Sequence, residues 1–372
     1  MLAKRIKESS PSLTLVITQK VNQMKKQGID VVSLTVGELD FDTPEFIIDA
    51  ATKAMKSGET RYTPVAGIVQ LREAICAKLK NDNDLIYTPE QIVVSNGAKH
   101  SLHNAIMALI NPGDEVIIIK PYWLSYPELV KLAGGIPVYV NSISKIKGVV
   151  TKKTKMIIVN SPSNPSGIVY TKAEFVRLAE EIKDTNIWVL SDEIYEKLVY
   201  GKAEHFSIAS IYPRTVVVNG LSKSHAMTGW RIGYTACCTE LAQAMAALQS
   251  QTTSNINTPT QFAAVAALTD KRGEEFIKQT RQELGTRLNY VIKRLGAVPN
   301  AKFIKPDGAF YVMLDVSRWG TAADFATKLL EQEKVAVIPC ESFGAPAYIR
   351  ISYTTSMSEL EKGLNRLERF MK

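Results

Sequence analysis

The sequence predicts an α/β protein whose large domain contains a seven-stranded, mostly parallel sheet, with a smaller α+β domain beside it. Three observations support this prediction. Between residues 90 and 240, short β-rich runs alternate with helical patterns, as in a parallel sheet covered by helices. At 372 residues the chain exceeds one ordinary hydrophobic core. After residue 260 the pattern changes to a long charged helix, followed by mixed strands and helices.

The strands are expected at short runs of β-branched and apolar residues between residues 90 and 240. In chain order these runs are IVVS (92–95), EVIII (115–119), IPVYV (136–140), KMIIVN (155–160), IWVLSD (187–192), TVVVN (215–219) and IGYTACC (232–238).

Helical patterns surround these runs. In residues 43–58 we expect Thr43 as the N-cap, Pro44 at the first helical position and Gly58 as the stop signal. The packing face of that helix would carry Phe46, Ile47, Ala50, Ala51, Ala54 and Met55. Two further packing faces predict helices, formed by Ile68, Leu71, Ile75 and Leu79, and by Leu102, Ala105, Ile106 and Leu109.

The C-terminal part has a different character. Residues 261–296 read as long, charged and helical, and residues 300–372 alternate strand and helix patterns. We therefore expect a large domain at 41–270 and a small domain made of 1–40 plus 271–372.

Composition excludes several functional classes. The chain is 45% hydrophobic and 22% charged, as ordinary soluble proteins are. Its first residues, MLAKRIKESSPSL, hold no apolar stretch of signal-peptide length, and no later run approaches the ~20 apolar residues of a membrane span. We therefore expect a cytoplasmic protein without a membrane partner.

The cysteines, histidines and basic residues also lack special patterns. The four cysteines show no C-x-x-C spacing and the four histidines no H-x-x-x-H spacing, so we expect buried thiols and no metal site. The net charge of +8 permits nucleic-acid binding, but the basic residues are spread along the chain. The one tight lysine cluster, at 152–155, has no interleaved aromatic residues, which favours a solvated surface and no nucleic-acid partner.

Candidate functional residues follow the predicted strands, because ligands of open α/β sheets bind at the carboxyl ends of strands. The loop SNGAK places Gly97 and Ala98 at a helix N-terminus, where free N–H groups suit a phosphate. Alone this is an ordinary turn, but Ser222 and Arg231 add a hydroxyl and a guanidinium, which are good phosphate donors.

Asp192, Tyr195 and Lys223 stand at the ends of two apolar strands. Asp192 could be a salt-bridge partner or an N-cap, or it could face a cationic heterocyclic nitrogen. Tyr195 could be core, or its hydroxyl could bond an anionic ring oxygen. Lys223 fits a snorkelling surface lysine poorly, and a partly desolvated lysine can form a Schiff base with an aldehyde. Together with a phosphate cradle, these groups describe a site for pyridoxal 5'-phosphate (PLP).

Seven motifs carry a resemblance that extends nearly from end to end of the chain. In order they are SLTVGELDFDTP, RYTPVAGIVQLREAI, PYWLSYPE, VNSPSNPSG, SDEIYE, LSKSHAMTGWRIGY and YIRISY. The chain resembles the class I aminotransferases of PLP fold type I, and within them the 1-beta branch of bacterial aspartate aminotransferases.

The resemblance implies roles for the residues around the cofactor. Lys223 would form the internal aldimine and, once released by substrate, move the Cα proton. Asp192 would keep the pyridine nitrogen protonated, Tyr195 and Asn164 would bond the phenolic oxygen, and Trp123 would stack on the ring. The phosphate would be bound by Gly97, Ala98, Ser222 and Arg231 of one subunit and by Tyr62 from the other subunit of a homodimer.

The resemblance also implies the substrates. Arg350 would clamp the α-carboxylate bidentately with help from the Gly37 backbone. Lys99 matches the lysine that meets the distal carboxylate of aspartate or glutamate, and the alternative is that Lys99 faces solvent. Ser12 and Thr14 match residues that close over the site. The implied reaction transfers the amino group of L-aspartate to 2-oxoglutarate in a ping-pong cycle, giving oxaloacetate and L-glutamate.

Other functions stay open at this stage. Prephenate or an aromatic, alanine-like or branched amino acid could be the real partner, and a PLP-dependent β-lyase shares most cofactor residues. The fold also occurs as a sensing module in transcription regulators, but 35 residues before it are too few for a DNA-binding domain. One departure stands out: the connection NSISKIKGVVTKKT, at 141–154, is shorter than the family's usual one, which carries an extra helix.

Overall fold

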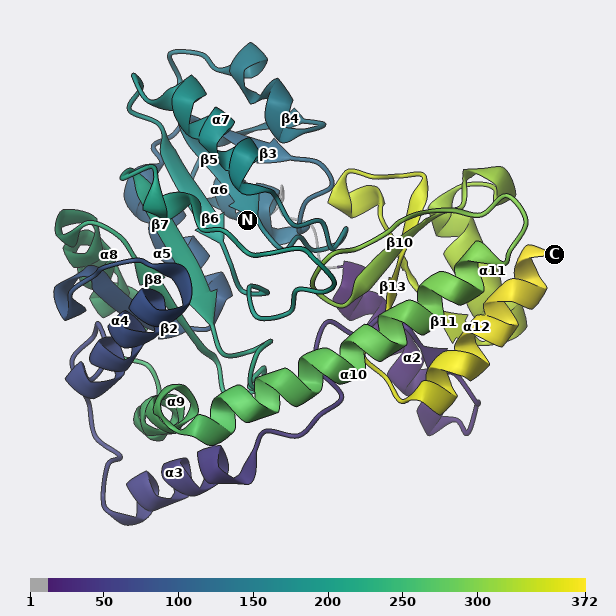
Figure 1. Ribbon diagram of the computed structural model, residues 1–372, viewed down its shortest axis with the longest axis horizontal. Coiled ribbons are helices and arrows are strands. Elements are labelled where there is room, and N and C mark those ends of the chain that lie inside the picture. Colours follow the sequence, from purple (N-terminus) through teal and green to yellow (C-terminus); the bar gives the residue numbers. More distant parts are fainter. Residues whose placement is uncertain (1–12) are drawn as a thin grey trace, which may run out of the picture.

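Seven strands form one sheet in the order β2-β8-β7-β6-β5-β3-β4, in a computed structural model that describes residues 13–372 (Figure 1). β8 runs antiparallel to both of its neighbours, and the other pairs are parallel. The predicted fold class is confirmed, with every predicted strand present. The bounds are β2 (Ile92–Asn96), β3 (Glu115–Ile119), β4 (Ile136–Val140), β5 (Thr154–Asn160), β6 (Trp188–Asp192), β7 (Thr215–Gly220) and β8 (Ile232–Ala236).

Helices cover both faces of this sheet because successive strand residues point to opposite faces. Val93, Val216 and Val218 pack with α5 (Ala98–Leu109), α6 (Ser125–Leu132) and α8 (Thr239–Thr252). Val94 and Val217 face the other way, toward a layer formed by α3 (Glu45–Lys56), α4 (Val69–Asn83) and α9 (Thr258–Thr269). On the same side, α7 (Lys172–Ile182) packs over β3, β5 and β6.

The first helix differs from the expectation at its N-terminus. α3 begins at Glu45, and its N-cap position is Pro44, with no side-chain cap bond. Thr43 instead donates a hydrogen bond to the Ala226 carbonyl oxygen at 2.6 Å and accepts one from the Trp230 indole at 3.0 Å. Thr43 as N-cap was therefore wrong, because these distant partners take its hydroxyl. Met55, placed on the packing face, is 50% exposed.

The expected helix at 261–296 is in fact two helices. α9 ends at Thr269, and α10 (Lys271–Gly296) begins after Asp270, whose carboxylate accepts the backbone N–H of Arg272 at 2.9 Å. An N-cap aspartate of this kind starts a new helix direction. In Figure 1, α10 then runs from the seven-stranded sheet to the C-terminal part of the chain.

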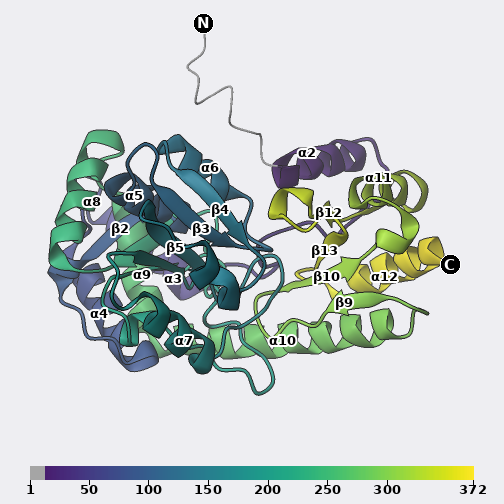
Figure 2. The same cartoon turned by 90° about the horizontal axis from the view of Figure 1, so that it is seen from above.

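The C-terminal part contains a second, antiparallel sheet in the order β12-β13-β10-β9. Its strands are β9 (Lys302–Ile304), β10 (Tyr311–Asp315), β12 (Ile338–Pro339) and β13 (Tyr348–Ser352). A short parallel pair joins β1 (Val32–Ser33) to β11 (Val335–Ala336), so the N-terminal segment belongs to this side of the molecule. Figure 2 shows α2 (Leu13–Lys26), α11 (Ala322–Glu333) and α12 (Met357–Met371) around this sheet. The division at residues 40 and 270 stays a prediction.

The short connection between β4 and β5 still covers the sheet. It holds one 3₁₀ segment, Ile143–Val149, and both Ile143 and Ile146 are buried in the same cluster as residues of α7. None of the helices within residues 13–372 combines the length and apolarity that a bilayer crossing requires.

Candidate active site

A cavity of about 600 Å³ lies between the carboxyl ends of β6 and β7, the N-terminus of α5, and side chains of α2, β10 and β13. Most of the predicted site residues line it. They are Thr14, Gly37, Ala98, Lys99, Trp123, Asn164, Asp192, Tyr195, Ser222, Lys223, Arg231 and Arg350. Gly97 directly precedes α5, Tyr62 is 90% exposed and outside the lining, and Ser12 lies outside the described residues.

Lys223 follows β7 by three residues, and its side chain lines the cavity. Its Nζ donates a hydrogen bond to the carbonyl oxygen of Gly37 at 2.5 Å. Burial lowers the pKa of Lys223 to about 8, assisted by Arg231 and Arg350 and opposed by Glu38 and Asp192. A lysine with this pKa is more often neutral, and therefore more nucleophilic, than a lysine in water.

Asp192 is the last residue of β6 and is 4% exposed. Its Oδ2 accepts the Tyr126 hydroxyl at 2.7 Å and its Oδ1 accepts the Ile194 N–H at 3.2 Å. Burial raises the pKa of Asp192 to about 6, although both hydrogen bonds act to lower it. A buried carboxylate held by neutral donors is suited to a protonated ring nitrogen, which would supply the missing positive charge.

Tyr126 was missed by the sequence analysis. It is 2% exposed and lies on α6, three residues after Trp123, with the two rings in edge-to-face contact at 5.4 Å. The motif PYWLSYPE contains both residues, so the spacing was visible. The partner of Tyr126 is Asp192, which lies 66 positions away in the sequence, so the pairing of these two residues was not visible.

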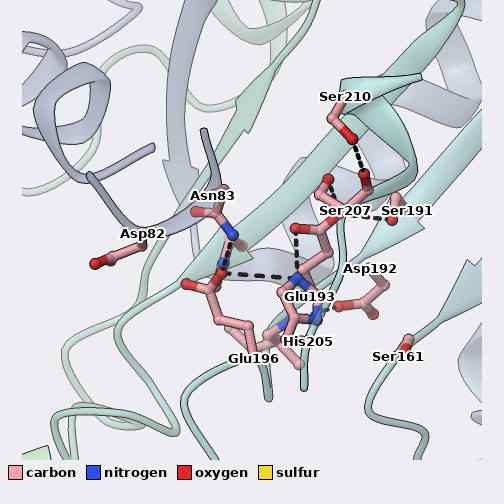
Figure 3. A network of polar contacts seen from close by, with 12 residues as sticks. Asp82, Asn83, Ser161, Ser191, Asp192, Glu193, Glu196, His205, Ser207 and Ser210 are labelled. Carbon is pink, nitrogen blue, oxygen red and sulfur yellow. Dashed lines mark hydrogen bonds and ion pairs between the residues drawn. The ribbon is translucent and has the colours of Figure 1, made fainter. Parts of the chain in front are cut away.

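Glu193 does not line this cavity, and its side chain lies in a network of paired groups (Figure 3). Its carboxylate accepts the Ser191 hydroxyl at 2.8 Å and the Ser207 hydroxyl at 2.6 Å, and contacts His205 Nε2 at 3.1 Å. Burial lowers the pKa of His205, but the contact with Glu193 outweighs it and the pKa is raised. We call Lys78, Asn83, Ser191, Glu193, Glu196, His205 and Ser207 the paired network.

The paired network also lies beside a second, more open cavity of about 820 Å³, lined by residues of α10 and by Glu196 and His205. Glu196 forms an ion pair with Lys78 and accepts the Asn83 amide at 2.7 Å. Although burial opposes it, these partners lower the pKa of Glu196 to about 2. The carboxylates are thus satisfied by protein groups, which distinguishes this region from the 600 Å³ cavity.

The part of the 600 Å³ cavity beside the N-terminus of α5 is suited to bind a phosphate. Gly97 has φ +80°, and a Cβ there would lie 2.5 Å from Arg231 Nη2, so only glycine allows this approach to the N-terminus of α5. The Arg231 guanidinium donates to the carbonyl oxygens of Thr228 and Asn96 at 2.8 and 3.4 Å. Both acceptors, within residues 13–372, are uncharged carbonyl oxygens. The positive charge of Arg231 is therefore not neutralised by them, and it lies beside the N-terminus of α5, where N–H groups favour an anion.

Arg350, on β13, is only 2% exposed. It donates from Nη1 to the Asn164 side-chain oxygen at 3.0 Å and from Nη2 to the Thr35 carbonyl at 2.8 Å. Its Nε is buried without a hydrogen-bond partner among the described residues. A buried guanidinium with uncharged partners and a free donor is prepared for an anionic ligand such as a carboxylate.

Lys99, Tyr195 and Tyr311 also line the cavity. The Lys99 ammonium lies 5.0 Å from the centre of the Trp123 ring, and burial, followed by Arg231, lowers its pKa. The Tyr195 and Tyr311 hydroxyl oxygens are 3.1 Å apart. Tyr311, like Tyr126, was not predicted as a site residue.

Comparisons with known proteins agree with this geometry. Residues 29–367 match the family described as "Aminotransferase class I and II". The chain is 47% identical over 391 residues to an aspartate aminotransferase of Bacillus sp. (strain YM-2), covering 100% of this chain and 99% of the relative. It is 40% identical to the aspartate/prephenate aminotransferase of Thermus thermophilus, covering 100% and 98%. A solved structure, aspartate aminotransferase from Thermus thermophilus with maleate, superposes with a TM-score of 0.97 at 40% identity, covering 100% and 99%.

Proposed function

The chain belongs to the class I and II aminotransferases, and we propose that it transfers the amino group of L-aspartate to 2-oxoglutarate, giving oxaloacetate and L-glutamate. Enzymes of this family depend on PLP. The proposal depends chiefly on one observation: Lys223 lies in a single cavity with the Asp192 carboxylate, the Arg231 guanidinium and the Arg350 guanidinium. These groups match an aldehyde, a ring nitrogen, a phosphate and a substrate carboxylate.

Each residue around the cofactor would have a separate role. PLP, when bound, supplies an electron-withdrawing ring that stabilises negative charge at the substrate Cα. Lys223 would hold it covalently in the resting enzyme and then carry the Cα proton, for which its pKa of about 8 is suitable. Asp192 would keep a proton on the ring nitrogen, Tyr195 and Asn164 would donate to the phenolic oxygen, and Trp123 would pack on the ring.

The phosphate would be bound at Gly97 and Ala98 by the Ala98 N–H, together with the Ser222 hydroxyl and the Arg231 guanidinium. The Gly97 N–H already donates to the Ser95 carbonyl oxygen at 2.7 Å, so Gly97 would contribute the close approach of its backbone. Tyr62 would complete this site from the second subunit of a homodimer. Its 90% exposure supports this role, because a tyrosine that serves a neighbouring subunit has no cover within its own chain.

The substrate would be held at both ends. Arg350 would bind the α-carboxylate, helped by the backbone at Gly37, and Lys99 would bind the distal carboxylate. Thr14 lies in the cavity lining, where it could close over a ligand; Ser12 is proposed for the same role from the sequence alone. A ping-pong cycle follows, since donor and acceptor would use the same carboxylate sites in turn.

The proposed reaction is tested with the purified chain, PLP and aspartate. We expect an absorbance band after PLP binding, a change in that band on adding aspartate, and oxaloacetate in the solution. Absence of both the spectral change and oxaloacetate would contradict the proposal. In the variant Lys99→Ala, activity with aspartate should fall and activity with alanine should remain.

Prephenate is the second candidate acceptor, because the Thermus thermophilus relative is named an aspartate/prephenate aminotransferase. A set of acceptors that includes prephenate, and of aromatic and alanine-type donors, separates the two activities. Release of pyruvate without any keto-acid acceptor would indicate a PLP β-lyase instead. The cytoplasmic location stays a prediction.

A further inference from the structure

Tyr311 is a buried residue of β10 that contacts several parts of the proposed active site at once. It is 1% exposed. In the register of β10 and β13, Tyr311 lies opposite Ser352 and Met313 opposite Arg350. Tyr311 and Arg350 are therefore diagonal neighbours on the same face of the sheet, a separation that large side chains bridge.

The ring of Tyr311 supports the Arg350 guanidinium. The distance from Arg350 Cζ to the ring centre is 4.2 Å, within the range of a cation–π contact. The Phe343 ring lies at 5.4 Å from the same atom. Because two of the guanidinium nitrogens are held by Asn164 and Thr35, the Tyr311 ring helps to fix the direction of the free Nε.

The hydroxyl of Tyr311 lies close to two other residues of the cavity lining, Tyr195 and Gly37. It lies 3.1 Å from the Tyr195 hydroxyl, and a Cβ at Gly37 would lie 3.1 Å from it. The Gly37 carbonyl oxygen is the acceptor of the Lys223 ammonium. One side chain from the second sheet thus touches the segment that holds Lys223 and the tyrosine assigned to the cofactor.

Counting protons gives the direction of the bond between the two tyrosines. Each hydroxyl has one proton to donate. If Tyr195 donates to the phenolic oxygen of PLP, the bond between the tyrosines must use the proton of Tyr311. Hydrogen bonds in a chain strengthen one another, so a donated proton from Tyr311 makes Tyr195 a stronger donor.

We propose that Tyr311 is a positioning residue with two separable functions: its hydroxyl directs and strengthens the Tyr195 donor, and its ring holds Arg350 for the substrate carboxylate. This inference rests on the proposed function. The charged groups that face the two tyrosines are Arg350 on β13, Asp192 on β6, and Glu38 and Lys223 in loops.

The two functions are separated by Tyr311→Phe, which removes only the hydroxyl, and Tyr311→Leu, which also removes the ring. The first readout is the absorbance of the holoenzyme between pH 5 and 10, which gives the pKa of the bond between PLP and Lys223. The second is the affinity of the PLP-free protein for maleate, measured by calorimetry. Tyr353→Phe is the control, because it removes a buried hydroxyl from a residue just beyond β13 and outside the cavity lining.

In Tyr311→Phe we expect the spectroscopic pKa to rise by about 0.3 to 0.5, because a weaker Tyr195 donor stabilises the deprotonated form less. Maleate affinity should stay within about twofold of the wild type. Tyr311→Leu should show the same rise and, in addition, a loss of maleate affinity of about five- to tenfold, as expected for a desolvated cation–π contact. Tyr353→Phe should change neither.

Two results would overturn the inference: an unchanged pKa in Tyr311→Phe, or equal maleate affinities for the Phe and Leu variants. Neither result would contradict the proposed reaction of the wild-type protein. Failure of the proposed function would look different, since the wild-type protein would then show no response to PLP and aspartate. Tyr311→Phe keeps the ring packing, so the hydroxyl is tested even if Tyr311→Leu does not fold.

Discussion

The paired network around Glu193 and the active-site cavity are two buried, charged regions joined through adjacent residues, Asp192 and Glu193. In the paired network, hydroxyl, amide and ammonium groups of the protein satisfy each carboxylate. In the cavity, Asp192 has only neutral partners, and Arg350 keeps a free buried Nε within the described part of the chain. Charge alone therefore does not identify a functional site. What distinguishes the cavity is buried charge without a charged protein partner, which is costly until a ligand supplies the missing charge.

The largest expected contrast concerns the two lysines of these regions. Lys223→Ala should reduce kcat by about 10⁴-fold or more, since it removes the residue proposed as both the covalent anchor and the general base. PLP should then bind only noncovalently. Lys78→Met, in the paired network, should lower the melting temperature while the folded enzyme keeps its kcat. Steady-state kinetics measure kcat and thermal unfolding measures the melting temperature of each variant. Turnover by Lys223→Ala would contradict the role proposed for Lys223.

Arg350 and Glu196 test the same contrast through stability. Glu196→Gln breaks a buried ion pair and should cost about 3 to 5 kcal/mol of unfolding free energy. Arg350→Gln should leave the stability of the PLP-free protein unchanged or raise it, because a buried cation that has no counter-ion within residues 13–372 is removed. The same variant should raise KM for aspartate by about 100-fold, as expected for a lost charged contact. Denaturant unfolding and steady-state kinetics of both variants measure these effects. A large stability loss in Arg350→Gln would contradict the proposed difference between Arg350 and Glu196.

Asp192 and Glu196 should give opposite dependences of stability on pH. The pKa of Glu196, about 2, lies below its usual 4.5, so its stabilising contribution is complete above pH 4.5 and is lost as the pH falls toward 2. The pKa of Asp192 is raised from 3.8 to about 6, so the folded PLP-free protein loses stability as the pH rises through this range.

Asp192→Asn should therefore stabilise the PLP-free protein by about 3 kcal/mol at pH 7 and have no such effect well below pH 4, given about 1.4 kcal/mol per pKa unit. Urea unfolding at a series of pH values measures this difference. A constant difference at all pH values would show that ionisation of Asp192 is not its cause.

The smallest contrast is between two serines. Ser207→Ala removes one hydrogen bond from Glu193 and should cost about 1 kcal/mol of stability. Ser222 makes no hydrogen bond within residues 13–372 although it is 6% exposed, so Ser222→Ala should leave the PLP-free protein unchanged and weaken PLP binding several-fold. Melting temperatures with and without PLP separate the two effects. An equal stability loss in both variants would remove the distinction.

The strands of the seven-stranded sheet and about half of the cavity lining could be predicted from the sequence. The strands carry local signals, short apolar runs followed by polar residues, and parallel strands bring those ends together. The errors came where a distant contact replaced a local one. Thr43 has the side chain of an N-cap, yet its hydroxyl bonds the Ala226 carbonyl, 183 positions away. Tyr126 and Tyr311 look like core aromatics until their partners are known, since their hydroxyls meet Asp192 and Tyr195 only in the folded chain.

The sequence by itself determined which chemical groups are available: a lysine, a carboxylate and two arginines placed at or near strands, within motifs that predict a PLP site. The tertiary structure decided which of those charges are paired. Whether a carboxylate is held by cations or left for a ligand depends on side chains from other elements, as Glu193 and Asp192 show one residue apart. A hydrogen bond is made over about 3 Å in space, and sequence distance does not determine which groups meet within it.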